Sequence, residues 1–233
     1  TRSGYIVMGG GFAEIATALP GQALKLPDTS GLEEASLMEP LSCCVHSIKK
    51  TELGFGDTLV VIGAGTMGAM HVALAKLHGA RVMVSDLDDE RLKILEKMGA
   101  DITINPRRDD AEKIVRDHTE GRGADAAIVA AGARIAGEQA LKLVRKGGTV
   151  VFYSSLYPPA PVDLDWNHLH YNETVIKGTE GSTARDFQEA VGLLAGEAID
   201  LRPLISKVIS LEELPGELAN KPAGEMQRVI VTP

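Results

Sequence analysis

Between about residues 31 and 196, short β-branched segments alternate with helix-periodic segments that end at glycine. Thr58–Ile62 is a continuous apolar run typical of a buried strand, and Thr66–His78 follows as a helix that ends at Gly79. Four further helices are expected at Asp88–Met98, Asp109–Glu120, Ile135–Lys146 and Ala184–Ala195, and five further strands at Arg81–Ser85, Ile102–Asn105, Asp125–Ala130, Thr149–Tyr153 and Thr174–Lys177. This alternation predicts an α/β fold, a doubly wound parallel sheet with helices on both faces.

The two ends of the chain lack this alternation. Residues 1–30 hold short extended pieces with Pro20 and Pro27, and residues 200–233 hold two short β-like runs, Leu204–Ile209 and Arg228–Val231. Neither end has enough apolar residues to bury a core alone. We therefore expect three segments: part of a second domain at 1–30, a central domain at 31–199, and a return to the second domain at 200–233.

Composition and charge exclude several classes of partner and compartment. The 233 residues are 44% hydrophobic and 24% charged, which is ordinary for a globular protein with a real core. The net charge is -8 and no Lys/Arg run exceeds two residues, so the chain lacks the basic surface that nucleic-acid binding requires. The apolar run at Leu59–Ile62 is too short to span a membrane. The adjacent Cys43 and Cys44 favour a reducing, cytoplasmic compartment.

The strongest local motif is the sequence Gly63-Ala64-Gly65-Thr66-Met67-Gly68. It leaves a predicted strand and opens a predicted helix, which is the setting that a dinucleotide-binding GxGxxG loop requires. Gly63 permits the tight turn, Gly65 lets the backbone approach a pyrophosphate, and Gly68 lets the helix pack against the strand. The alternative is a glycine-rich turn without a ligand. The setting favours dinucleotide binding.

A carboxylate follows at the end of the next strand. Asp86 lies 18 residues after Gly68, where it can accept hydrogen bonds from the adenosine ribose and repel a 2′-phosphate. Asp88 and Asp89 add negative charge where an NADP site would carry arginine. The pattern therefore favours NAD over NADP. Arg91 lies one helical turn later and, taken alone, reads as a solvated surface charge.

Small and polar residues follow the later strands. They comprise Ala131, then Tyr153, Ser154 and Ser155, then Thr179, Glu180 and Gly181. In an open α/β sheet these ends line the ligand crevice, so the residues could accommodate a nicotinamide and its ribose. Ordinary turn chemistry explains any one of them equally well.

Glu39 stands at the start of a predicted helix, next to Pro40. A carboxylate at a helix N-terminus is electrostatically favourable, and the local sequence favours this helix-capping role for Glu39. The other interpretation is a metal-facing carboxylate at the cofactor crevice. His168 and His170 form an HxH pair without an evident third ligand, so we interpret them as structural.

Taken together, these motifs resemble the medium-chain zinc-dependent alcohol dehydrogenases, in particular the branch of sorbitol and other polyol dehydrogenases and threonine dehydrogenase. The resemblance covers the whole chain. It rests on Gly10-Gly11-Phe12-Ala13-Glu14, Lys25-Leu26-Pro27, Glu39-Pro40-Leu41-Ser42, the glycine loop, Asp86 with Arg91-Leu92, Met98-Gly99-Ala100-Asp101, Gly181-Ser182-Thr183 and Leu204-Ile205-Ser206.

The resemblance implies a Rossmann domain flanked by β-rich parts of a GroES-like catalytic domain, and a homodimer or homotetramer. It implies that zinc polarises an alcohol or polyol oxygen while hydride passes to NAD. Asp86 and Arg91 would hold the adenosine ribose, and Arg228 would reach the cofactor. Ala131, Tyr153, Ser154, Ser155 and Thr179 to Gly181 would line the nicotinamide half. On family grounds Glu39 becomes a residue that faces the zinc.

The resemblance has one large departure. The family's front part, with its catalytic Cys, its His-Glu pair and any four-cysteine zinc lobe, has no counterpart in these residues. Two alternatives therefore stay open. One is an NAD(H)-binding module without catalysis of its own. The other is a zinc-free NADPH reductase, against which Asp86 and Glu39 both argue.

Overall fold

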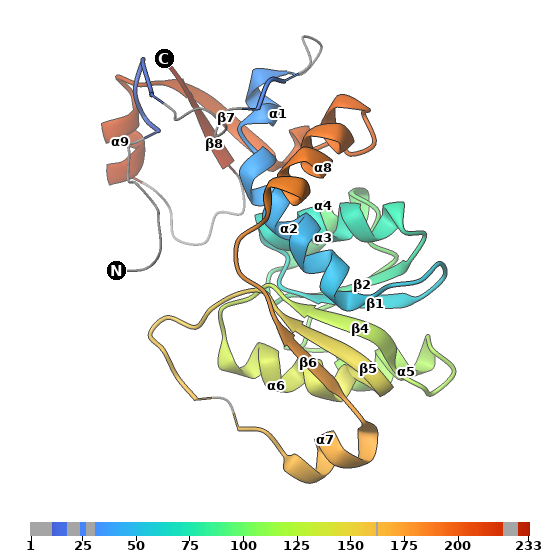
Figure 1. The fold of residues 1–233 in the computed structure, drawn as a ribbon. Coiled ribbons are helices and arrows are strands. Elements are labelled where there is room, and N and C mark those ends of the chain that lie inside the picture. The colour runs from blue at the N-terminus through green and yellow to red at the C-terminus, as the bar shows by residue number, and fades with distance from the viewer. Residues whose placement is uncertain (1–10, 18–23, 27–30, 162, 221–227) are drawn as a thin grey trace.

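The fold is described by a computed structural model that covers residues 11–17, 24–26, 31–161, 163–220 and 228–233. Its centre is a six-stranded parallel sheet in the order β3-β2-β1-β4-β5-β6 (Figure 1). The strands are β1 (Thr58–Ile62), β2 (Arg81–Ser85), β3 (Ile102–Ile104), β4 (Ala124–Val129), β5 (Val144–Phe152) and β6 (Val175–Gly178). This order is that of a Rossmann fold and confirms the predicted doubly wound α/β architecture.

Helices cover both faces of the sheet. They are α1 (Leu32–Ala35), α2 (Met38–Thr51), α3 (Thr66–Leu77), α4 (Asp89–Lys97), α5 (Ala111–Asp117), α6 (Arg134–Leu143), α7 (Trp166–Asn172) and α8 (Ala184–Ala195). Helices α2, α3, α4 and α8 lie on one side of the sheet, and α5 and α6 lie on the other (Figure 1).

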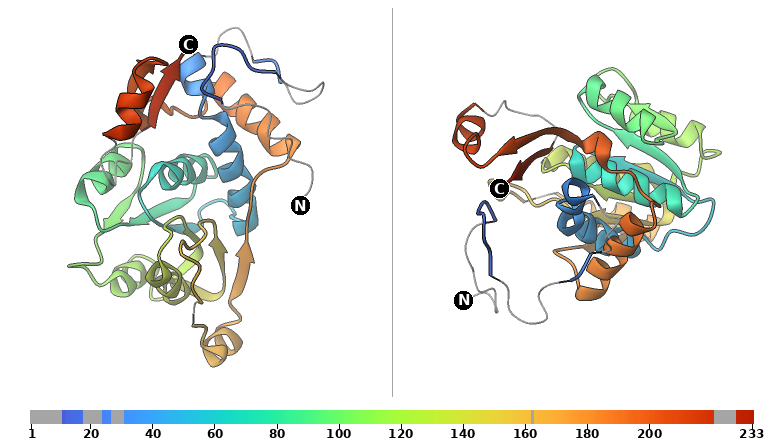
Figure 2. Two further views of the ribbon diagram at one scale, coloured as in Figure 1. Left: turned by 90° about the vertical axis from the view of Figure 1, so that its left-hand side faces the viewer. Right: turned by 90° about the horizontal axis from the view of Figure 1, so that it is seen from above.

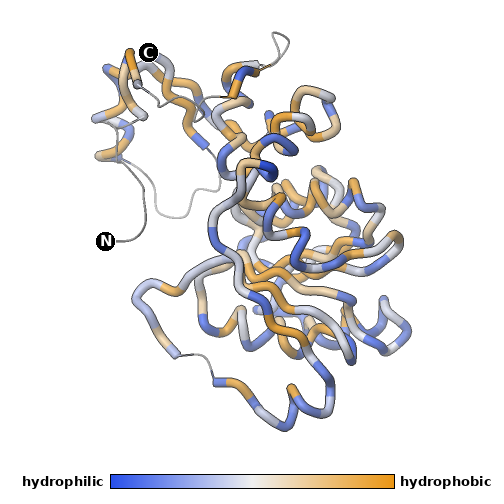
Figure 3. Tube along the Cα trace, viewed as in Figure 1, coloured by the Kyte–Doolittle hydropathy of each residue, from blue (hydrophilic) through white to orange (hydrophobic). Residues whose placement is uncertain are grey.

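Alternate residues of β1 point to the two faces. Leu59 and Val61 pack into the core beneath α2 and α3, whereas Val60 and Ile62 pack against α5 and α6. All four side chains are buried, which explains why this part of the strand is a continuous apolar run in the sequence. Figure 3 shows hydrophobic residues concentrated along the central strands. Successive side chains of a strand point to opposite faces of the sheet, so an unbroken apolar run predicts a strand that is buried on both faces.

Several element boundaries differ from the sequence prediction. Helix α6 ends at Leu143, not at Gly147-Gly148, and β5 begins at once with Val144. Gly147 adopts φ 69° within this early part of β5, where the register with β4 shifts. The glycines therefore serve a strand irregularity instead of stopping a helix. Helix α2 begins at Met38, which places Glu39 inside the first turn. Helices α1 and α7 are not predicted from the sequence.

The C-terminal segment forms a separate two-stranded sheet. Strands β7 (Ile205–Ser210) and β8 (Arg228–Thr232) pair in parallel, and the short helix α9 (Leu214–Ala219), also not predicted, lies between them in sequence. These elements project from one side of the main body in both further views (Figure 2). Leu201, Leu204 and Ile230 are buried in the core beneath α2 and α3. The segment therefore uses the central core as its anchor.

Most of residues 1–30 lie outside the described residues, including Gly9, Gly10, Pro20 and Pro27. The same holds for Pro222. Within the described part of the chain, no helix combines the length and the apolar character that a bilayer crossing requires.

Candidate functional site

The carboxyl ends of the parallel strands meet along one edge of the sheet, where two pockets open. The chain leaves β1 and β4 in opposite directions along the sheet, and such a switch point is where ligands bind in open α/β folds. We call the two cavities the Asp86 pocket and the Thr179 pocket. The Asp86 pocket has a volume of about 570 Å³ and the Thr179 pocket about 630 Å³.

The Asp86 pocket is built mainly from the turns that follow β1, β2 and β4. Its lining consists of Ile62, Gly63, Ser85, Asp86, Leu87, Asp88, Asp89, Arg91, Pro106, Arg107, Ala131, Ala133, Ile135, Ala136 and Gln139. Leu87 and Ile135 are 50% and 73% exposed, and with Ile62, Pro106 and three alanines they give the cavity an apolar part beside its charged groups. An aromatic ring with polar edges fits such a lining.

The glycine loop closes one wall of this site through very tight contacts. A Cβ on Gly68 would lie 1.9 Å from the carbonyl oxygen of Gly63, and a Cβ on Gly63 would lie 2.9 Å from the amide nitrogen of Ala131. A Cβ on Gly65 would meet no atom within 4 Å. Gly63 and Gly68 are therefore required by packing. Gly65 instead faces open space at the N-terminus of α3, where it caps the helix without a side-chain hydrogen bond.

Asp86 joins the glycine loop to the turn after β2. Its Oδ2 accepts a hydrogen bond from the Ala64 amide at 2.6 Å, and its Oδ1 accepts one from the Asp88 amide at 2.9 Å. Each oxygen keeps further lone pairs for a ligand in the pocket. The carboxylate is therefore oriented before any ligand arrives, which the sequence pattern did not predict.

Two arginines add positive charge at the same pocket. Arg91 forms an ion pair with Asp88, with 3.7 Å between Arg91 Nε and Asp88 Oδ2. Arg91 also lines the cavity, so it is not merely a surface charge. Arg107, in the loop after β3, also lines the pocket and was missed by the sequence reasoning. The one sequence signal for Arg107 as a pocket residue is its position after a predicted strand, which it shares with other lining residues.

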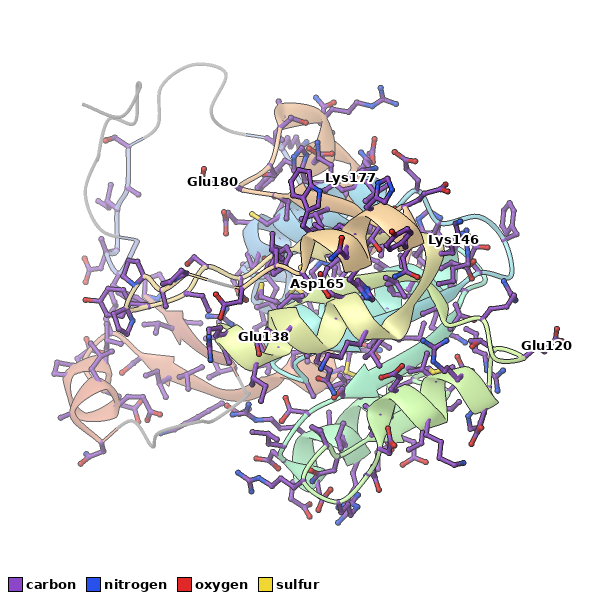
Figure 4. All side chains as sticks on the ribbon, turned by 90° about the horizontal axis from the view of Figure 1, so that it is seen from below. Glu120, Glu138, Lys146, Asp165, Lys177 and Glu180 are labelled. Carbon is purple, nitrogen blue, oxygen red and sulfur yellow. The ribbon has the colours of Figure 1, made fainter. Side chains whose placement is uncertain are left out.

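The Thr179 pocket lies where β5 and β6 end. It is lined by Cys43, Gly132, Phe152, Tyr153, Ser154, Ser155, Gly178, Thr179, Glu180 and Gly181. The hydroxyl oxygen of Thr179 is buried and has no hydrogen-bond partner among the described residues. An unpaired buried hydroxyl costs free energy, and Thr179 belongs to the pocket lining, where a hydrogen bond to a ligand would offset that cost. In the view of Figure 4, Glu180 and Glu138 lie to the left of Glu120 and Lys146.

Tyr153 is supported by a buried cluster from α2 and α3. Its hydroxyl lies 3.1 Å from Met67 Sδ, and its ring meets the His71 ring edge-on at a centroid distance of 4.8 Å. Burial lowers the pKa of His71 to about 4 and raises the pKa of Tyr153 well above its usual range, with Cys44 adding to the latter. Both side chains are therefore neutral at pH 7 and hold the end of β5 by packing.

Glu39 is exposed in the first turn of α2, and its Oε1 lies 3.5 Å from the thiol of Cys43, which lines the Thr179 pocket. Burial and then the neighbouring Glu39 charge raise the pKa of Cys43. Across the described residues, no three His, Cys, Asp or Glu side chains converge as a metal ion would need. The described residues therefore do not form a complete zinc site.

Neither Ala131 nor Arg228 is among the residues that line the Thr179 pocket. Ala131 lines the Asp86 pocket, and its neighbour Gly132 lines the Thr179 pocket. Arg228 begins β8 and is exposed, and it is not among the residues that line either pocket. Thr66 and Met67 lie in the first turn of α3, so the glycine loop is arranged as predicted.

The sequence profile of the family described as "Zinc-binding dehydrogenase" matches residues 66–196, more than half of the chain. The chain belongs to this family. D-arabitol-phosphate dehydrogenase of Enterococcus avium is 34% identical over 81% of this chain and 54% of its own length. Sorbitol dehydrogenase of Halalkalibacterium halodurans is 28% identical over 96% of this chain and 66% of its own length. The resemblance to zinc-type polyol dehydrogenases is thus confirmed.

A solved structure supports the same placement within the zinc-binding dehydrogenase family. A candidate zinc-binding dehydrogenase from Sinorhizobium meliloti 1021, bound to NADP, aligns with a TM-score of 0.89 at 30% identity. The alignment covers 96% of this chain and 66% of that one. Across these three proteins, the chain spans between 54% and 66% of the relative's length.

Proposed function

We propose that this chain is the cofactor-binding portion of an NAD-dependent, zinc-type alcohol or polyol dehydrogenase. In this reaction the alcohol carbon gives a hydride to C4 of the nicotinamide and the hydroxyl loses a proton, so alcohol and NAD⁺ become carbonyl compound, NADH and H⁺. The observation that carries the proposal is the pre-oriented Asp86 carboxylate, hydrogen-bonded to the Ala64 amide of the glycine loop. Family membership supports the reaction class.

The adenosine half of the cofactor is proposed to occupy the Asp86 pocket. Asp86 would accept the ribose hydroxyls, with Arg91 beside it, and the adenine would lie near Leu87 and Ile135. The pyrophosphate would lie against the backbone of Gly63, Gly65, Thr66, Met67 and Gly68 at the N-terminus of α3.

The nicotinamide half is proposed to occupy the Thr179 pocket. Tyr153, Ser154, Ser155, Thr179, Glu180 and Gly181 line it, as expected of residues at the ends of β5 and β6. The unpaired hydroxyl of Thr179 would bond to a polar group of this half. Ala131 lies on the Asp86 side, so we assign it to the adenosine half.

The proposed preference is for NAD over NADP. Asp86, Asp88 and Asp89 surround the position of the ribose and would repel a 2′-phosphate. The Sinorhizobium meliloti neighbour is bound to NADP, and Arg91 and Arg107 give this pocket some positive charge. The three carboxylates outnumber the two arginines at the pocket, which supports the preference for NAD.

The remaining roles belong to the complete enzyme. We propose that residues 31–199 are the cofactor domain and that residues 1–30 and 200–233 belong to the catalytic domain, where Arg228 would reach the cofactor. Glu39 is proposed to face the zinc, since it lies beside Cys43 at the Thr179 pocket. The substrate would be a small alcohol or polyol. Strand β6 is an edge strand with Val175 and Ile176 exposed, which fits a homodimer or homotetramer joined there.

Binding titrations test the proposal directly. NADH, NADPH and ADP-ribose are titrated into the protein, with dissociation constants from calorimetry. We expect NADH and ADP-ribose to bind, and NADH to bind roughly tenfold or more tightly than NADPH. Absence of binding by all three ligands would contradict the cofactor assignment. A preference for NADPH would contradict the role given to Asp86.

A further inference from the structure

The Gly178–Thr183 loop connects the edge strand β6 to helix α8 and forms one wall of the Thr179 pocket through Gly178, Thr179, Glu180 and Gly181. The loop residues Gly181, Ser182 and Thr183 are exposed, so the loop is not held by burial of its own side chains. Its position must therefore be set by specific contacts at its ends.

Asp186 provides such contacts from the first turn of α8. The residue is only 3% exposed. Its Oδ2 accepts hydrogen bonds from the Thr183 amide at 2.9 Å and the Thr183 hydroxyl at 2.6 Å. Its Oδ1 accepts one from Lys49 Nζ at 2.7 Å, and His46 Nδ1 lies 2.9 Å from Oδ2. The carboxylate thus joins the end of the loop to helix α2.

The ionised state of Asp186 is strongly favoured. Burial alone would raise its pKa, but hydrogen bonds from Lys49, Thr183 and His46 outweigh that effect and hold the pKa well below its usual range. A buried carboxylate with this many donors is fully satisfied, so it fixes the geometry of every group that it contacts.

A second contact joins the same two segments. The hydroxyls of Ser42 and Ser182 lie 2.8 Å apart, within hydrogen-bond distance. Ser42, His46 and Lys49 recur at intervals of four and three residues, so they share one face of α2. Cys43, which lines the Thr179 pocket, and Glu39 belong to the same turns of this helix. One helix therefore lines the pocket through Cys43 and also contacts the Gly178–Thr183 loop and Asp186.

The cap of α8 alone does not explain this arrangement. A capping box needs only Thr183 and the Asp186 side chain, and both of its hydrogen bonds are present. His46 and Lys49 add contacts from α2 to a cap that is already complete, and the Lys49 side chain is 42% exposed. Since a partly exposed ion pair contributes little net stability, the geometric effect of these contacts is the more telling one.

We propose that Asp186 is a positioning residue that fixes the Gly178–Thr183 loop against α2, so that the Thr179 pocket is pre-shaped for the nicotinamide half of the cofactor. This inference rests on the proposed function. Asp186 touches no ligand itself and acts through Thr183 and the loop. The Asp86 pocket shares none of these contacts, so the effect is confined to one half of the cofactor.

The test compares NADH with ADP-ribose, which lacks the nicotinamide, on the full chain. We expect Asp186→Asn to weaken NADH binding roughly tenfold while ADP-ribose binding changes less than about twofold. Ser182→Ala removes the other contact at an exposed position and keeps the test decisive if Asp186→Asn folds poorly. For it we expect a roughly threefold selective loss of NADH binding.

Asp125→Asn is the matched control. Asp125 also binds a backbone amide, that of Thr58 at 2.8 Å, and a cation, Arg145 at 2.6 Å, but it lies at the amino ends of the strands. This variant should lose stability without changing the ratio of NADH to ADP-ribose affinity.

The possible outcomes distinguish a failure of the proposed cofactor binding from a failure of the positioning role of Asp186. If the unaltered protein binds neither ligand, the proposed function is wrong and the positioning role falls with it. If it binds both, and Asp186→Asn and Ser182→Ala weaken both equally or leave both unchanged, only the positioning role is overturned.

Discussion

The two pockets are built in different ways. In the Asp86 pocket, Asp86 bonds to the amides of Ala64 and Asp88, which lie 22 and 2 residues away in sequence. The Thr179 pocket brings together Cys43, Phe152 and Thr179 from three separate parts of the chain. The glycine loop and Asp86 therefore give the first pocket a recognisable sequence pattern, whereas the second pocket depends on tertiary contacts between α2, β5 and the loop before α8.

The largest expected effect concerns the glycine loop. Gly68→Ala places a Cβ 1.9 Å from the Gly63 carbonyl oxygen, so α3 must move away from β1. We expect the free energy of unfolding to fall by about 3 kcal/mol or more, measured by urea denaturation. The control Gly192→Ala, at an open helical position, should be neutral or stabilising by up to ~1 kcal/mol. Equal stability of both variants would contradict the packing role of Gly68.

This difference explains what the sequence can and cannot predict. Thr58–Ile62, Arg81–Ser85 and Ala184–Ala195 form the elements predicted for them, because apolar periodicity is a local signal. Asp86 and the glycine loop are likewise found together at one pocket. The contacts of Asp186 with His46 and Lys49 span about 140 residues, and no local pattern indicates them. Nor does a local pattern indicate that Ala131 and its neighbour Gly132 line different pockets.

A pH-dependent effect is expected beneath the Thr179 pocket. His71 is fully buried, and its pKa is lowered from about 6.5 to about 4. Between these values the unfolded chain binds the proton and the folded one does not, so stability is complete above about pH 6.5 and falls towards pH 4. In the parent protein, the free energy of unfolding should fall by an amount on the order of 3 kcal/mol between pH 6.5 and pH 4 because of His71. We expect His71→Phe to abolish this fall.

Urea denaturation at pH 7 and pH 4 measures this loss. The exposed His118, whose Nδ1 bonds to the Ile114 carbonyl, gives the control His118→Gln, which should leave the pH dependence unchanged. If His71→Phe leaves the pH dependence of the parent protein intact, His71 is not buried in its neutral form.

Gly65→Val separates binding from stability within the glycine loop. Its side chain would enter open space, so the fold should persist, but that space is where the pyrophosphate is proposed to lie. We expect NADH and ADP-ribose both to bind roughly 100-fold more weakly, because both contain the pyrophosphate. Gly192→Val is the control for adding valine at an open glycine. Unchanged affinity in the folded Gly65→Val variant would remove the loop from the site.

Asp86→Asn keeps the shape of the side chain, removes its charge and replaces one of the two oxygens that accept backbone N–H bonds by an NH2 group. NADH should bind roughly tenfold more weakly, and NADPH should lose less or gain, because repulsion of the 2′-phosphate disappears. Calorimetry with both cofactors measures the change in their ratio. Glu96→Gln removes a charge from an exposed residue of the neighbouring α4 and serves as the control. An equal effect on both cofactors would mean that Asp86 does not select between them.

The smallest expected effect is at Thr179 and bears directly on the second pocket. Its hydroxyl is buried without a partner among the described residues, so Thr179→Val removes an unsatisfied polar atom while keeping the shape. Stability should stay equal or rise slightly, whereas NADH binding should weaken roughly threefold and ADP-ribose binding should not change. Most substitutions that weaken ligand binding also lower stability. Weaker NADH binding together with unchanged or higher stability would therefore be informative. A loss of stability would show that the hydroxyl already has a partner inside the protein. Equal effects on NADH and ADP-ribose would place Thr179 outside the nicotinamide half, and the division of the cofactor between the two pockets would have to be redrawn.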